Sequence, residues 1–268
     1  MLMRLKIFIL FVAIQALSLG LWSALNTAEA SSSVEPTEYA PVHPAPEALS
    51  DLNFQARNMD EDSHFLNSIR QNQIETALKN LPAQHLSSVK DIILDYNEEA
   101  HRGLGGNSMI ILRAVNMDTE EMVGVLIHEM AHNVDYAYLE NEEKEEVSPF
   151  KDGKMTLYES DPSLDFYRIS WENNTTRVKT ASNIDFVSGY AMSDPFEDFA
   201  ETYTYYVLHN KDFRVMAGTS DALYQKYQFM KYQVFDGMEF DTGDGEVNTE
   251  NRPWDITVLS YDINQFLS

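Results

Sequence analysis

Residues 128–132 read His-Glu-Met-Ala-His, a spacing that can bind a metal ion and activate water. On a helix, His128 and His132 lie one turn apart on the same face, so both imidazoles can bind one ion. Glu129 is rotated by about 100° and can reach a water bound to that ion. Zinc binds imidazole and carboxylate readily, and a catalytic zinc keeps one position for water. The motif therefore predicts a Zn²⁺ site in which Glu129 is the general base.

The third protein ligand must come from elsewhere in the chain. The metzincin pattern requires glycine at 135 and histidine at 138, but these positions hold Asp135 and Tyr138, which excludes that class. The chain has no cysteine, and its other histidines form no second ligand motif. Glu197 and Glu201 lie at helical i, i+4 spacing. One carboxylate can bind the metal, and the other can accept the outward N–H of a ligating imidazole.

Two predicted helices must position these groups. The first covers about 119–139. Asp118 and Glu121 have the spacing of a capping box at its start, and apolar residues lie around most of its circumference, which indicates burial. The second begins at Asp194 and Pro195, a favoured cap and first-turn pair.

The remaining segments predict an α+β fold. Helical periodicity covers 62–82, where Phe65, Leu66 and Ile69 join the predicted apolar stripe, and a further helix is expected around 220–235. Short apolar runs predict strands at 88–96, 108–116 and 253–263. Glycine-rich residues 102–107 and acidic residues 140–149 are interpreted as loops. The carboxylates of residues 236–246 miss the spacing of an EF-hand loop.

The two ligand motifs resemble those of the gluzincin metallopeptidases. Residues 188–201, SGYAMSDPFEDFAE, are similar to the zinc-site segment of the anthrax-lethal-factor-like peptidases. In those proteins, a tyrosine seven residues before the glutamate ligand helps to stabilise the transition state. Tyr190 stands seven residues before Glu197.

This resemblance implies three zinc ligands: His128, His132 and Glu197. It also implies Glu129 as general base, Tyr190 as oxyanion donor and Glu201 as the carboxylate that supports a ligating imidazole. The implied fold is zincin-like, with a small mixed sheet whose edge strand lies beside the buried His-Glu-x-x-His helix. The segment 108–116 is the candidate for that edge strand, where an extended substrate could pair by β-augmentation.

The N-terminus has the pattern of an export signal. Arg4 and Lys6 precede an uncharged stretch, and Ala28-Glu29-Ala30 fits a cleavage site, so residues 1–30 are predicted to be a signal peptide. An uncleaved membrane anchor is the competing interpretation, because the apolar stretch is long. Proline-rich residues 31–52 predict a linker, and 53–268 the peptidase domain. The expected location is therefore periplasmic or extracellular.

The formal net charge of −24 restricts the partners. It disfavours nucleic acid and anionic membranes and would attract cationic peptides. The simpler interpretation of this charge is that it keeps an exported protein soluble. The expected function is a zinc-dependent endopeptidase acting on a peptide or protein. Two other classes are compatible with these residues: a zinc-containing binding module without activity, and a metal-dependent hydrolase of other amides, such as cell-wall peptides.

Overall fold

The computed structural model describes residues 49–61, 63–97, 101–113, 117–138, 146–247 and 251–267, all within one compact unit, Pro41–Ser268. The predicted signal peptide and the first eighteen residues of the predicted linker lie outside the described residues. None of the helices in the described part of the chain is long and apolar enough to cross a membrane.

A four-stranded mixed sheet forms one side of the fold. Its strands lie in the order β1 (Asn53–Arg57), β2 (Asp91–Asp95), β4 (Met109–Arg113), β3 (Gly103–Gly106). The first three are parallel, and β3 is antiparallel to β4. Strands β2 and β4 read as nearly continuous Ile and Leu, which is the pattern of strands buried on both faces.

The sheet departs from the sequence prediction at its edge. Residues 102–107 were expected to be a loop, and 108–116 the edge strand. Instead β4 lies inside the sheet between β2 and β3, and the glycine-rich β3 is the edge strand. Glycine is disfavoured in strands, so its β propensity gave no signal here. At this edge glycine matters because it has no side chain, which lets β3 lie close to α5.

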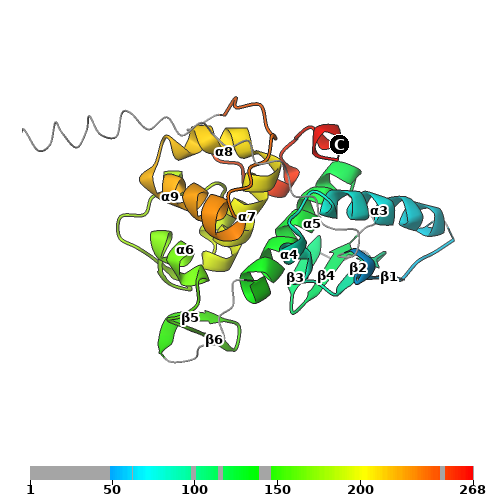
Figure 1. Cartoon of the computed structure of the whole chain (residues 1–268), viewed down its shortest axis with the longest axis horizontal. Helices are drawn as coiled ribbons and strands as arrows, with labels where there is room; N and C mark the ends of the chain where they lie inside the picture. Colours follow the sequence, from blue (N-terminus) through cyan, green and yellow to red (C-terminus); the bar gives the residue numbers. More distant parts are fainter. Residues whose placement is uncertain are drawn as a thin grey trace, which may run out of the picture. The chain divides into compact units, whose positions relative to one another are not determined.

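The helices and two hairpins complete the fold. The helices are α3 (Ser63–Leu78), α4 (Ala83–Leu86), α5 (Thr119–Asn133), α6 (Ser163–Ser170), α7 (Pro195–Leu208), α8 (Asn210–Ala217), α9 (Asp221–Phe229) and α10 (Ile263–Phe266). The hairpins are β5 (Val147–Asp152) with β6 (Met155–Tyr158), and β7 (Trp171–Asn173) with β8 (Thr176–Arg177). Figure 1 shows α5 between the sheet and α7.

Both site helices begin as their caps predict. The Asp118 carboxylate accepts the Glu121 N–H at the start of α5. The Asp194 carboxylate accepts the N–H groups of Phe196 and Glu197 at the start of α7. Helix α5 continues into a π-helical turn, Val134–Tyr138. Its almost complete burial confirms the expectation from its apolar circumference.

Three other predictions are wrong. The tail segment expected as a strand forms a 3-10 turn, Ile256–Val258, and then α10. Strand β5 begins at Val147 inside the segment expected to be a loop, whereas residues 139–145 lie outside the described residues. The start of α3 also leaves Phe65, Leu66 and Ile69 exposed, because only its second half packs into the core.

Candidate active site

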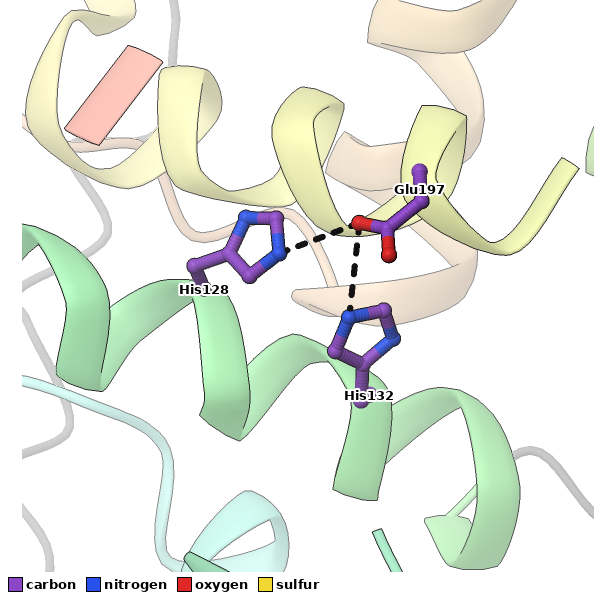
Figure 2. A group of neighbouring side chains, drawn as sticks. All are labelled: His128, His132 and Glu197. Carbon is purple, nitrogen blue, oxygen red and sulfur yellow. Dashed lines mark ion pairs between the residues drawn. The ribbon is translucent and has the colours of Figure 1, made fainter. Parts of the chain in front are cut away.

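Two histidines from α5 and one glutamate from α7 converge on one point. The Nε2 atom of His128 lies 3.2 Å from Oε2 of Glu197, and the Nε2 atom of His132 lies 3.6 Å from the same oxygen. Figure 2 shows both imidazoles directed from α5 toward Glu197 on the neighbouring helix. Candidate ligand atoms of these three residues all lie within 4.8 Å of one another. This is the residue set that the sequence predicts to bind a metal.

Glu201 lies behind this cluster. Its Oε1 atom is 3.1 Å from Nδ1 of His128, on the side of the ring away from Glu197. Its Oε2 atom accepts hydrogen bonds from the Ser188 hydroxyl (2.5 Å) and from the Ile256 N–H (2.9 Å). The side chain is fully buried. The two glutamates therefore have different neighbours. Glu197 lies near the Nε2 atoms of both histidines, and Glu201 lies near Nδ1 of His128 only.

The electrostatics of the cluster fit a cation. Burial lowers the pKa of His128, but Glu197 and Glu201 outweigh it and raise that pKa well above its ordinary value. Burial raises the pKa of Glu197, and the two histidines more than reverse this, so the pKa lies below its ordinary value. Among the described residues, Oε2 of Glu197 has no hydrogen-bond partner of good geometry. A divalent cation would satisfy this oxygen while leaving both imidazoles neutral.

Tyr190 faces the same cluster from the loop before α7. Its hydroxyl donates a 3.0 Å hydrogen bond to Oε1 of Glu197. The C-terminal segment fixes this loop, because the N–H groups of Gly189 and Tyr190 donate to the carbonyls of Pro253 and Trp254. No sequence pattern predicts this support, because it joins segments more than sixty residues apart.

A comparison with protein families agrees with this geometry. Residues 112–259, more than half of the chain, match the family model described as "Putative zinc-binding metallo-peptidase". The chain belongs to this zinc-binding metallo-peptidase family. No curated protein and no solved structure matches the chain. The family match spans α5, α7 and the C-terminal turn, so it includes all the site residues described above.

In this member of the metallo-peptidase family, Glu129 is enclosed by the edge strand. Its side chain is 7 % exposed, and burial raises the pKa of its carboxyl. A Cβ atom added at Gly103 would lie 2.3 Å from Oε1 of Glu129. One added at Gly105 would lie 2.3 Å from the Glu129 carbonyl oxygen. Only glycine lets β3 lie this close to α5, so Gly103 and Gly105 are site residues that the sequence did not reveal.

We expect Gly105→Ala to disturb this arrangement strongly. The new methyl group would overlap the α5 backbone, so β3 must move away from Glu129. Hydrolytic activity should fall on the order of 100-fold, since a displacement of about 1 Å near the reacting groups can have that effect. The control is Gly218→Ala, because an added Cβ there would meet only the Val215 carbonyl oxygen at 3.3 Å and Gly218 does not line the cleft. Equal activities for the two variants would contradict the steric role of Gly105.

An open cleft of about 680 Å³ gives access to the cluster. Its walls include β3, the β5–β6 hairpin and the first turn of α7. His128, Glu129, His132, Tyr190 and Glu197 all line it. The cleft therefore brings a bound molecule against every residue predicted to take part in catalysis. Residues 236–246 contribute no comparable ligand group within the described part of the chain.

Asp135 lies in the same cleft, one helical turn beyond His132. Its side chain is buried, and its Oδ2 atom accepts a 2.5 Å hydrogen bond from the Tyr167 hydroxyl. Burial raises the pKa of Asp135 to about 7. The nearby Ser163 hydroxyl lowers this pKa, but by less than burial raises it. Ser163 Oγ and Asp135 Oδ1 nevertheless form no hydrogen bond of ordinary geometry among the described residues.

We expect Asp135→Asn to stabilise the protein at neutral and alkaline pH. In the folded protein Asp135 stays protonated up to about pH 7, whereas in the unfolded chain it ionises at its lower, ordinary pKa. The free energy of unfolding therefore falls as the pH rises from about 4 to about 7. Removing this carboxyl should raise the free energy of unfolding by about 1–3 kcal/mol at pH 8. Near pH 4 the gain should vanish. Urea denaturation at the two pH values measures it, and a pH-independent difference would contradict the titration of Asp135.

Proposed function

We propose that this protein is an exported zinc-dependent endopeptidase. The observation that carries the proposal is the placement of Glu129. It is a buried carboxylate on the same helix as two converging imidazoles, and it lines an open cleft. A site that only held zinc for structure would need neither this carboxylate nor open access. The export signal predicted over residues 1–30 supplies the location.

The ligands in this proposal are His128, His132 and Glu197. Zinc held by these residues would supply Lewis-acid chemistry, polarising a carbonyl and lowering the pKa of water. Glu129 takes the proton from the attacking water and passes it to the leaving amine. The Tyr190 hydroxyl donates a hydrogen bond to the oxyanion that forms on the substrate. Oε1 of Glu201 lies 3.1 Å from Nδ1 of His128. In this proposal it accepts the Nδ1–H and so keeps Nε2 directed toward the other ligands.

The edge strand provides a surface for the substrate backbone. Among the described strands, β3 pairs only with β4, so its outer edge can bond to another chain. An extended peptide added there would lie beside Glu129, which touches β3 through its two glycines. The proposal therefore assigns β-augmentation to residues 103–106 rather than to 108–116.

Metal analysis combined with peptide digestion tests the proposal. The purified protein should contain about one zinc per chain. It should cleave a mixed library of unstructured peptides at internal bonds, with the new termini identified by mass spectrometry. Zinc without cleavage of peptides, proteins or cell-wall peptide fragments would indicate the non-catalytic binding module. Cleavage restricted to cell-wall fragments would indicate the other amide hydrolase.

We expect Tyr190→Phe to lower kcat by about 100-fold while leaving zinc content and KM nearly unchanged. The substitution removes only the hydroxyl, and loss of one oxyanion donor has an effect of this size in other hydrolases. Steady-state kinetics with a quenched fluorescent peptide would measure it. An unchanged kcat would assign Tyr190 to packing, and loss of zinc would mean that the hydroxyl supports the ligands through Glu197.

A further inference from the structure

The cleft beside the proposed zinc site is strongly acidic. Besides the site residues Glu129 and Glu197, four aspartates line it: Asp135, Asp152, Asp161 and Asp194. The described residues that line it include no lysine or arginine. In such a concave site, one sign of charge concentrates counter-charged molecules. The overall charge of −24 acts in the same direction.

Asp135 is the buried member of this group. It is 8 % exposed, and one carboxylate oxygen bonds to Tyr167. The other oxygen, Oδ1, forms no hydrogen bond of ordinary geometry among the described residues, although the Ser163 hydroxyl is close enough to lower the pKa of Asp135. Asp161 is close enough for its charge to raise the pKa of Asp135 further. A cationic group placed beside Asp135 and Asp161 would favour the charged form of both carboxyls.

The walls around Asp135 are apolar and aromatic. The Tyr167 and Phe196 rings pack edge to face, with their centroids 5.3 Å apart, and both line the cleft together with Leu157 of β6. Apolar walls above a carboxylate suit a long aliphatic stem that ends in a positive charge. A second metal ion is a poorer match, because the described residues converge as a metal-binding group only at His128, His132 and Glu197.

We propose that this pocket binds a lysine or arginine side chain of the substrate and so directs cleavage to sites near a basic residue. The inference rests on the proposed peptidase function. Asp135 lies only three residues after His132, in the π-helical turn that continues α5. The selected residue therefore lies close to the scissile bond rather than at a remote position. The cationic group lies beside the Asp135 carboxylate, and Asp161 adds negative charge.

Digestion of a randomised peptide library by the zinc-loaded protein tests the specificity. We expect lysine and arginine to be enriched at one position near the scissile bond. For a matched pair of peptides, kcat/KM should be at least about 10-fold higher with lysine than with norleucine there, as expected for a charge-assisted hydrogen bond. In Asp135→Asn this ratio should fall close to one. Asp165→Asn is the matched control, because Asp165 is exposed on α6 and does not line the cleft.

A binding measurement separates failure of this inference from failure of the proposed function. Glu129→Gln protein would be titrated with decapeptides of alanine and serine that carry lysine or norleucine at successive positions. If no peptide is cleaved but lysine still binds more tightly at one position and Asp135→Asn abolishes the difference, the pocket is confirmed and the peptidase function fails. If peptides are cleaved without basic selectivity, or if Asp135→Asn keeps that selectivity, the pocket assignment is wrong.

Discussion

Glu129→Gln should abolish nearly all hydrolysis, with kcat falling by about 10³-fold or more, while zinc content and fold remain those of the wild type. General-base catalysis contributes about 10²–10⁴-fold in enzymes, and glutamine cannot take a proton from water. The substitution is nearly isosteric, so it should fit the narrow space between α5 and the glycines of β3. Its oxygen can still accept the Gly105 N–H that contacts the carboxylate.

Single-turnover kinetics with a quenched peptide, combined with metal analysis, would measure this effect. Glu172→Gln provides the control, since Glu172 is exposed on β7 and lies outside the cleft. Activity within about 10-fold of wild type in Glu129→Gln would remove the general-base role from Glu129. Loss of zinc in this variant would instead show that Glu129 contributes to the metal site.

The second large effect is expected for the ligands. His128→Ala, His132→Ala and Glu197→Ala should each lose stoichiometric zinc, because each removes one of the three protein groups that converge on one point. Glu201→Ala should keep zinc but weaken its affinity by about 10- to 100-fold, the usual effect of losing the partner of a ligating imidazole. Zinc titration against a competing chelator gives these affinities.

The two glutamates are controls for each other in this series. They lie one turn apart on α7, yet only Glu197 contacts the Nε2 atoms of both histidines. A greater loss of affinity in Glu201→Ala than in Glu197→Ala would exchange their roles. His64→Ala provides a further control, because His64 is exposed on α3 and belongs to no metal-binding cluster in the described residues. It should retain full zinc content.

The ligands illustrate what local sequence can determine. The i, i+4 spacing of His128 and His132 places both rings on one helix face whatever surrounds the helix. The caps at Asp118 and Asp194 set the starts of α5 and α7, and apolar periodicity predicted the burial of both. The spacing of Glu197 and Glu201 predicted one ligand and one supporting carboxylate. All of these properties depend on residues within a few turns of one another.

The sequence by itself thus determined the two helices, the pair of imidazoles and the pool of candidate carboxylates. The tertiary structure decided which carboxylate faces the Nε2 atoms of both imidazoles, through the packing of α7 on α5. It also brought the Ile256 N–H to Glu201 across 55 residues and set the glycines of β3 against Glu129. Such contacts leave no periodic pattern, because they join segments whose separation in the chain is arbitrary. For the same reason, only the fold shows that Asp135 is buried in an acidic cleft with one oxygen unpaired among the described residues.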